Sequence, residues 1–453
     1  MVDLSRLSLD ATSLRCEYES RRLNPVEVVC EVYRRIRERG NDGVWLSLVP
    51  QDQAEASART LGPWRPELEL YGLPFGVKDN VDVAGLPTTC GCAAITRVPE
   101  RHATGVQRAL DAGAIVIGKQ NLDQFATGLN GTRTLGTFPR NAVNADYVPG
   151  GSSSGSAVAV AAGLVTFSLG SDTGGSGRVP AAMNGIVGLK PTFGLISANG
   201  MVFNNRLFDC MPVFSRNVDD AARVLRALKG PDGADPFSRE DRAQLEQSQP
   251  AALRWALPLP GQLQFFGDIS QEDAFQATVA RLVQAFGPPR RLDCSVYFEA
   301  GRLPFESALL AERALTYATV VREHRSAVHP AVAGLIDRGS GFSAEQAFEA
   351  MYQMQALRSA ARRLFDTIDV LMLPTVGRAW RCDEMLNDPI TLNNHNGYYT
   401  YPVNPLDMAA LALPGLPRAD GMPFGMQLVA PAGTDGLLLG LGRSIERLMD
   451  SAT

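Results

Sequence analysis

The 453-residue sequence has no apolar run of the ~20 residues that a membrane-spanning helix requires. Its start, Met1 to Arg6, lacks the basic region and apolar core of a secretory signal peptide. Blocks of basic residues, and basic residues interleaved with aromatic ones, are also absent, and the net charge is −5. These absences argue against a membrane partner and against nucleic-acid binding, and they favour a cytoplasmic protein.

Cysteine and histidine are scarce, with seven and four copies. An odd number of cysteines in so long a chain indicates reduced thiols, as in the cytoplasm. Cys90 and Cys92 lack the second pair or the nearby histidines that a zinc site needs. The histidines are scattered and none stands in a recognisable motif, although their number alone leaves a Ser-His-Asp triad open. We therefore expect neither a metal nor a cofactor.

Hydrophobic residues make up 45% of the chain and charged residues 20%, an ordinary globular balance. Length alone would allow two or three domains. Residues 24–27 predict the start of a helix, because an asparagine cap precedes a proline and an acid. This helix is expected to end at Gly40. Predicted strands at 44–49 and 73–83, then a helix at 103–112, indicate an α/β fold with a mixed sheet.

The same patterns predict further elements, which are a strand at 114–118, a buried helix at 157–162, a strand at 253–257, a capped helix from 343 to about 365, and a strand at 369–373. Residues 230–250 are polar and interrupted by Gly and Pro, which is typical of a surface connection. Residues 380–405 are rich in Asn, Tyr and Pro and predict an irregular loop, of the kind that forms lids or substrate walls.

Two glycine-flanked turns that carry serines stand out at residues 150–178, which read GGSSSGSAVAVAAGLVTFSLGSDTGGSGR. Glycine lets a backbone approach a ligand closely. The second turn places successive N–H groups beside the Ser176 hydroxyl, an arrangement that could stabilise an oxyanion while the serine attacks a carbonyl. A flexible linker would not enclose the apolar run from Ala157 to Leu169.

This stretch, with its continuation to Thr192, resembles the signature of the amidase signature family of serine hydrolases. Residues 76–80 resemble the family's catalytic-lysine strand, and residues 421–428 resemble its late strand. The resemblance implies an α/β amidase-signature fold, in which helices cover both faces of a mixed central β-sheet. It also implies one amidase domain over 1–453, with a helical segment at about 1–65, a signature core at about 70–215 and a variable substrate-side region at about 230–400. The family favours homodimers.

The resemblance also implies roles for individual residues. Lys78 matches the base, Ser152 the bridging serine with a cis peptide bond, and Ser176 the nucleophile. The N–H groups expected to form the oxyanion hole belong to Thr173, Gly174, Gly175 and Ser176. Residues expected to support the site are Ser153, which matches a second serine beside the lysine, together with Asp172 and Arg178, which match residues that hold the loop.

A catalytic base at neutral pH requires Lys78 to be uncharged, although lysine normally titrates near ~10.4. Burial lowers the pKa of a lysine, and the apolar residues 73–77 before Lys78 fit a buried strand. Neutral Lys78 would take a proton from Ser152, which would take one from Ser176. The same relay in reverse would protonate the leaving nitrogen.

Four segments, 121–129, 131–133, 177–180 and 405–411, resemble the amidase domain of allophanate hydrolases more than the family at large. We take Thr127 and Gly128 in the first segment as candidate substrate contacts. Those enzymes carry a Tyr and an Arg eight residues apart that hold the substrate carboxylate. An ungapped register puts Ala311 and Thr319 there, which would make allophanate a poor substrate and favour another small amide, urea-type or carbamoyl compound.

Arg313 and Arg322 lie close to those positions and could restore the carboxylate contact from a shifted register. Other interpretations stay open. One is a glutaminase-type A subunit of a tRNA-dependent amidotransferase, although the Ser-Asn-Leu and Asp-Gly stretch typical of that protein is missing. Another is a membrane-associated fatty-acid amide hydrolase, for which no anchor is evident. The last is a noncatalytic binding module, against which intact Lys78, Ser152 and Ser176 argue.

Overall fold

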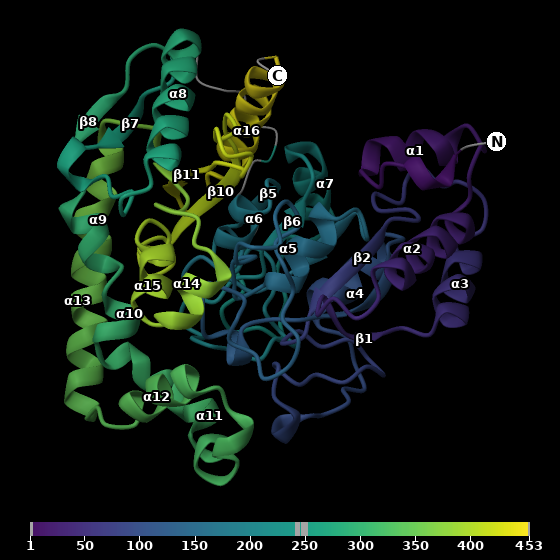
Figure 1. The fold of residues 1–453 in the computed structure, drawn as a ribbon, viewed down its shortest axis with the longest axis horizontal. Coiled ribbons are helices and arrows are strands. Elements are labelled where there is room, and N and C mark those ends of the chain that lie inside the picture. The colour runs from purple at the N-terminus through teal and green to yellow at the C-terminus, as the bar shows by residue number, and fades with distance from the viewer. Residues whose placement is uncertain (1–2, 241–244, 246–251, 452–453) are drawn as a thin grey trace.

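The computed structural model describes residues 3–240, 245 and 252–451. These residues form one mixed sheet of 11 strands in the order β1-β3-β2-β4-β6-β5-β10-β11-β9-β7-β8 (Figure 1). The strands are β1 (Trp45–Leu48), β2 (Pro74–Lys78), β3 (Ile115–Gln120), β4 (Phe167–Leu169), β5 (Val187–Lys190), β6 (Val213–Ser215), β7 (Trp255–Pro258), β8 (Arg290–Leu292), β9 (Val370–Pro374), β10 (Met408–Pro414) and β11 (Gly425–Pro431).

Parallel pairing is confined to the two sides of the sheet. Strand β2 pairs in parallel with β3 and β4, and β7 pairs in parallel with β8 and β9. The middle is antiparallel, because β6, β5, β10 and β11 pair in succession. The strands β10 and β11 come from the end of the chain, yet they complete the centre of the sheet.

Helices cover both faces of the sheet. Every residue of β2, β4, β5 and β6 is buried, which requires packing partners above and below. The helices are α1 (Ala11–Glu19), α2 (Pro25–Arg39), α3 (Gln51–Thr60), α4 (Thr104–Asp111), α5 (Ser154–Ala161), α6 (Val179–Met183), α7 (Val218–Leu228), α8 (Ile269–Phe286), α9 (Ser295–Ala300), α10 (Leu303–Glu306), α11 (Ala311–Glu323), α12 (Pro330–Gly339), α13 (Ala344–Arg362), α14 (Cys382–Asn387), α15 (Thr391–Gly397) and α16 (Asp435–Asp450).

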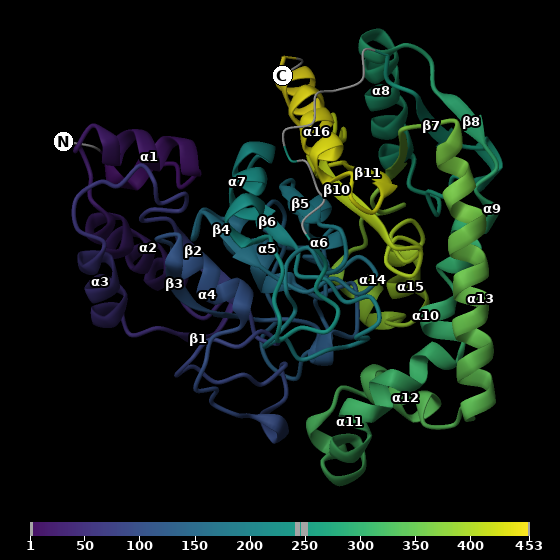
Figure 2. The same cartoon turned by 180° about the vertical axis from the view of Figure 1, so that it is seen from behind.

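Two groups of helices contact the middle of the sheet. Helices α5 and α6 contact each other, with α5 against β2, β4 and β6 and α6 against β5, β10 and β11. Helix α7 joins α4 and α16 in a second group, in which α16 contacts β10 and β11. Figures 1 and 2 show α1, α2 and α3 at the same end of the molecule as β1, and α9 and α13 beside β7 and β8 at the other. Helices α11 and α12 extend outward from that second end.

The predicted α/β class and mixed sheet are confirmed. Helix α2 begins after Asn24, whose side chain accepts from the N–H groups of Val26 and Glu27, and it ends before Gly40 at a φ of 65°. The predicted helices at 103–112 and 343–365 correspond to α4 and α13, and that at 157–162 to α5. The predicted strands at 44–49, 114–118, 253–257 and 369–373 correspond to β1, β3, β7 and β9.

Two predicted segments differ from the structure. The strand expected over 73–83 ends at Lys78, because the chain turns at Asp79, whose carboxylate accepts from the Thr89 N–H at 2.9 Å. The loop expected over 380–405 instead contains the helices α14 and α15. Within the predicted connection at 230–250, residues 241–244 and 246–250 lie outside the described residues, and the rest of that connection forms no helix or strand. The division of the chain into three segments of one domain stays a prediction.

The sheet also explains where the serine-bearing turns sit. Helices α5 and α6 begin at Ser154 and Val179, directly after the first turn and the second turn. Strand β5 passes so close to the second turn that a Cβ on Gly188 would lie 2.2 Å from the carbonyl oxygen of Gly177. Only glycine fits there without moving the turn, so strand and turn are held in one fixed relation.

Candidate active site

Lys78 and two serines form a continuous chain of hydrogen bonds. The Lys78 amine donates to Ser152 Oγ at 2.7 Å, and the hydroxyl oxygens of Ser152 and Ser176 lie 2.9 Å apart. All three side chains are buried, and the peptide bond between Gly151 and Ser152 is cis. The structure thus brings together the three residues that the resemblance selects, from β2 and from the two turns.

Burial controls the charge of Lys78. Removal from water disfavours the ammonium form and lowers the Lys78 pKa to about 7. The carboxylates of Asp123, Asp172 and Asp209 oppose this shift, but none forms an ion pair with Lys78 among the described residues. At neutral pH a large share of the amine is therefore unprotonated and can accept a proton.

Ser171, which the sequence analysis missed, is the second serine against the lysine. Lys78 Nζ lies 2.8 Å from Ser171 Oγ, and Asn80 Nδ2 donates to the same oxygen at 3.1 Å. Ser153 has no direct contact with Lys78, because Ser153 Oγ donates to the Ser171 carbonyl at 3.1 Å. Ser153 precedes the first residue of α5 and bonds to the residue that meets the lysine, so any support that it gives Lys78 passes through Ser171.

A buried ion pair holds the second turn. Arg178 Nε and Nη2 each donate to Asp172 at 3.0 Å, and both side chains are fully buried. Arg178 also donates to the Thr400 carbonyl and to Asn404 Oδ1, at 3.1 and 2.8 Å. Because these two acceptors lie near the end of the chain, the pair ties the turn to the segment between α15 and β10.

The ion pair also decides which N–H groups of the turn remain available. Asp172 accepts from the Gly175 N–H at 2.8 Å and from the Gly177 N–H at 2.9 Å. The Gly175 N–H is therefore engaged, contrary to its predicted place in an oxyanion hole. Within the described part of the chain, the N–H groups of Thr173, Gly174 and Ser176 have no acceptor.

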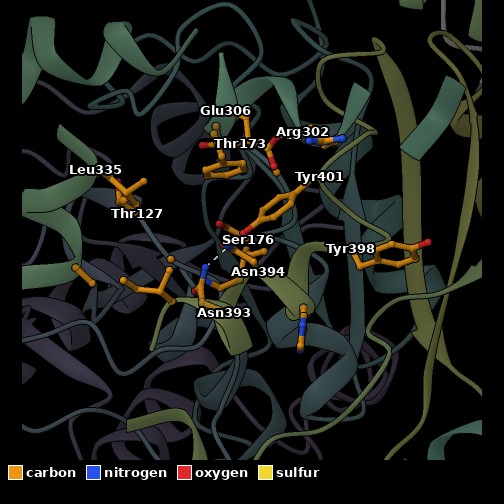
Figure 3. Close-up of a pocket in the computed structure, with 18 of the residues that line it drawn as sticks. Thr127, Thr173, Ser176, Arg302, Glu306, Leu335, Asn393, Asn394, Tyr398 and Tyr401 are labelled. Carbon is orange, nitrogen blue, oxygen red and sulfur yellow. Dashed lines mark hydrogen bonds and ion pairs between the residues drawn. The ribbon is translucent and has the colours of Figure 1, made fainter. Parts of the chain in front are cut away.

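Ser176 opens onto a cavity of about 920 Å³. The candidate contacts Thr127 and Gly128 line it, together with Thr173 and Gly174 of the turn (Figure 3). Thr127 Oγ1 accepts from Asn204 Nδ2 at 2.8 Å and donates to the Phe125 carbonyl at 3.1 Å. Thr127 is thus fixed in place, and a ligand would meet it as part of a rigid wall.

Arg313 supplies a guanidinium to this cavity. Its side chain is 1% exposed and lies over the Phe305 ring, 5.0 Å from the ring centre. Nη1 donates to the Pro304 carbonyl at 3.0 Å, and Nε has no partner among the described residues. Burial lowers the Arg313 pKa to about 10, so the group stays charged at neutral pH.

The register in which Ala311 and Thr319 replace a carboxylate-binding pair is therefore wrong. Neither of those residues lines the cavity, whereas Arg313 does. Arg322 is wrong as a substrate contact, because its side chain is 69% exposed outside the cavity and pairs with Glu323 at 3.2 Å. Helical periodicity explains the difference, since positions 313 and 322 of α11 are nine residues apart and face different directions.

The sequence analysis also missed Arg133 as a residue of the cavity wall. Arg133 is buried, and it donates to the carbonyls of Thr127 and Pro389 at 3.1 and 2.7 Å. The segment 131–133 was noted only for its resemblance, because a lone arginine in a loop gives no sign of burial.

In the part of the chain that the structure describes, no three His, Cys, Asp or Glu residues gather as a metal site would require, and no helix is long and apolar enough to cross a bilayer.

Comparisons with known proteins show the family of the chain. The family model described as Amidase matches residues 27–439. The urea amidolyase of Saccharomyces cerevisiae is 35% identical over 405 residues, which are 88% of this chain but 22% of that protein. The chain thus spans about a fifth of the length of the urea amidolyases that it matches. The A subunit of the glutamyl-tRNA(Gln) amidotransferase of Deinococcus deserti is 33% identical, with 87% of this chain and 86% of that protein covered.

A solved structure with the same fold is a serine-to-alanine variant of Kluyveromyces lactis allophanate hydrolase. It has a TM-score of 0.91 and 34% identity, with 97% of this chain and 72% of that chain covered. The expected amidase-signature fold, with a mixed sheet between helices, is thereby confirmed.

Removal of the Asp172 carboxylate should destabilise the protein more than removal of an exposed one. Asp172→Ala leaves the buried Arg178 charge uncompensated, for which we expect a loss of about 3–5 kcal/mol in the free energy of unfolding. Asp146→Ala is the matched control, because Asp146 forms an ion pair of 3.1 Å with Arg381 at the surface and should have little effect. Urea denaturation of the purified variants measures both, and equal costs would contradict the role of the buried pair.

Proposed function

The chain belongs to the amidase family, and on that premise we propose that it hydrolyses a C–N bond of a small amide, urea-type or carbamoyl substrate by a Ser–cis-Ser–Lys mechanism. The observation that carries the proposal is the buried chain of hydrogen bonds from Lys78 through Ser152 to Ser176, which ends at a cavity. As an amidase, the protein is a hydrolase of C–N bonds other than peptide bonds.

In the proposed first step, the neutral Lys78 amine takes a proton from Ser152 while Ser152 takes one from Ser176. The Ser176 oxygen then attacks the carbonyl carbon and forms a tetrahedral intermediate. The free N–H groups of Thr173, Gly174 and Ser176 support the developing oxyanion, because preorganised donors in a site shielded from water stabilise charge strongly.

The same proton path serves the remaining steps. The C–N bond breaks as the proton held by Lys78 returns through Ser152 to the leaving nitrogen, which departs as ammonia or an amine. Water then loses a proton along this path, attacks the acyl-serine ester and releases the acid, with the Ser176 oxygen protonated again. No step requires a metal or a cofactor.

Arg313 supports a substrate with an anionic end. Its buried guanidinium, with a free Nε, offers planar donors in the cavity to a carboxylate. The relatives named urea amidolyase and allophanate hydrolase point to allophanate, a urea that carries a carboxylate, as the substrate to test first. The expectation that allophanate is a poor substrate rested on Ala311 and Thr319, which lie outside the cavity.

A glutaminase-type A subunit is the second candidate, since glutamine also combines an amide with a carboxylate and the relative from Deinococcus deserti is matched over most of its length. The missing Ser-Asn-Leu and Asp-Gly stretch argues against it. Ammonia release from glutamine, compared with release from allophanate, separates the two.

We also propose a cytoplasmic homodimer, for which the family resemblance and the free cysteines of the described chain are the support.

Ser176→Ala should abolish turnover and leave the fold intact. Loss of the nucleophile is expected to lower kcat by a factor on the order of 10⁴ or more, with residual rate from binding alone. Ammonia release measures turnover, and mass spectrometry after treatment with a fluorophosphonate should find the adduct on Ser176 of the wild type alone. A noncatalytic protein would give no adduct, and a variant that kept a tenth of the activity would contradict the assignment.

Lys78 predicts a pH dependence of activity and stability. Activity should fall about tenfold per pH unit once the pH drops below about 7, because protonation removes the base. The unfolded lysine titrates near ~10.4, so between pH 7 and that value the unfolded chain binds more protons and stability rises with pH. Below pH 7 both states are protonated and this contribution to stability stays lost.

Lys78→Ala tests both effects. It should be as inactive as Ser176→Ala, and its unfolding free energy should depend less on pH between 7 and 10 than that of the wild type. Asp209, whose pKa burial raises to about 6, also titrates near the site and remains in the variant. An activity profile that is flat from pH 5 to pH 9 would sink the proposed base.

Arg313→Ala should lower kcat/KM for allophanate by about 100-fold, mainly through KM, because a desolvated carboxylate would lose its charged partner. Biuret, in which an uncharged amide replaces the carboxylate, should be affected far less. Arg322→Ala is the control of equal size on the same helix and should match the wild type. If Arg322→Ala is the damaging change, or if both substrates suffer equally from Arg313→Ala, the proposed anion contact is wrong.

A further inference from the structure

The Tyr401 side chain lies in the cavity wall close to the nucleophile's turn, as Figure 3 shows. A Cβ built on Gly174 would lie 2.9 Å from Tyr401 Cδ1, so the ring packs directly on the backbone two residues before Ser176. The ring also packs on Phe305, with 4.3 Å between the ring centres, and Phe305 lies against the Arg313 guanidinium. Tyr401 is therefore held by packing, and no sequence motif pointed to it.

The Tyr401 hydroxyl oxygen accepts a hydrogen bond, but the hydroxyl hydrogen has no acceptor among the described residues. Asn393 Nδ2 donates to its oxygen at 3.4 Å, shown as the dashed line in Figure 3. The Asn393 carbonyl oxygen already accepts from the Leu129 N–H at 2.7 Å and from Asn130 Nδ2 at 3.1 Å. These contacts fix which way the amide points, so Asn393 presents its NH₂ group to Tyr401, and the hydroxyl hydrogen is left unused.

The other buried tyrosines of the described chain behave differently. Each donates its hydroxyl to a backbone carbonyl, as a structural hydroxyl in an interior must, and they are Tyr18, Tyr33, Tyr71, Tyr297, Tyr317 and Tyr399. Tyr401 is also buried, with 8% of its surface exposed, but its hydroxyl lacks such an acceptor within the residues that the structure describes. A buried donor without an acceptor costs stability, and a ligand in the cavity would satisfy it.

Positive charge surrounds this donor. The guanidinium groups of Arg133 and Arg313 act on Tyr401, and the Nε of each arginine has no partner among the described residues. The nearby acid is already engaged, because Asp123 accepts from three backbone N–H groups, at 2.9–3.2 Å. The acceptor that fits the unused hydrogen is therefore an anionic oxygen of a ligand.

We propose that the Tyr401 hydroxyl donates to the anionic end of the substrate that Arg313 binds, and that Tyr401 is a specificity-determining residue for small carboxylated amides. The proposal rests on the proposed function, because it assigns a second contact to the same bound substrate. Tyr401 and Arg313 both contact the Phe305 ring and both line the cavity, so one carboxylate bound there could meet both. The two groups together select a planar carboxylate over a neutral amide, because an NH₂ group would face donors on both sides.

Tyr401→Phe is the test, since it keeps the ring packing on Gly174 and Phe305 and removes only the hydroxyl. We expect kcat/KM for allophanate to fall about 10- to 100-fold through KM, and kcat/KM for biuret to change less than about threefold. Tyr398→Phe is the matched control, because the Tyr398 hydroxyl donates to the Gln262 carbonyl at 3.1 Å and is not left unpaired. Equal losses on both substrates, or no loss on allophanate, would overturn the proposal.

A binding measurement separates this proposal from the proposed reaction. Malonate, an unreactive dicarboxylate, should slow fluorophosphonate labelling of Ser176 in the wild type, and protection should need about tenfold more malonate in Tyr401→Phe. Protection of both proteins at equal malonate concentration, or of neither, would overturn the role of Tyr401 even if amides are hydrolysed. If Ser176 is not labelled and no amide is turned over, the proposed function itself fails.

Discussion

A buried amine at the end of β2, with no ion-pair partner among the described residues, is the constraint on which the site depends. In the proposed mechanism Lys78 is the base, and burial makes this possible because it disfavours the charged form. The carboxylates of three aspartates act against this shift. Asp172 is paired with Arg178, and Asp123 and Asp209 accept from backbone N–H groups. These contacts partly offset the negative charge of the three aspartates, which therefore stabilises the ammonium form of Lys78 less.

The negative charge of Asp79, the residue after Lys78, is also offset by a neighbour. Asp79 pairs with the buried Lys119 at 3.2 Å, and Lys119 also donates to Thr88 Oγ1 at 2.9 Å. A free carboxylate at position 79 would favour the protonated form of its neighbour. The second buried lysine thus has no direct contact with the chemistry, yet its charge offsets that of Asp79 beside the first.

Local patterns predicted most of the fold, because caps, apolar strands and glycine turns depend on neighbours in sequence, and the family resemblance selected Lys78, Ser152 and Ser176. The helix after Asn24 and the turn around Ser176 were found as expected, whereas the strand that bears Lys78 is shorter than expected. What failed depends on contacts between distant segments. Ser171 rather than Ser153 meets the lysine, and the spacing of the serines gave no sign of it. Helices α14 and α15 were hidden by their Asn and Tyr content, and the sequence could not separate Arg313, which lines the cavity, from Arg322, which does not.

The order of the strands has a consequence for the protein's synthesis. Strands β10 and β11 lie between β5 and β9, and Arg178 of the second turn bonds to Thr400 and Asn404, which leave the ribosome more than 200 residues later. A nascent chain that already contains Lys78, Ser152 and Ser176 therefore lacks the acceptors that lock their geometry and the strands that close their sheet. Such non-local pairing slows folding and leaves strand edges open in the meantime. We therefore expect the nascent chain to be inactive until the segment from Thr400 onward has been synthesised and has bound Arg178.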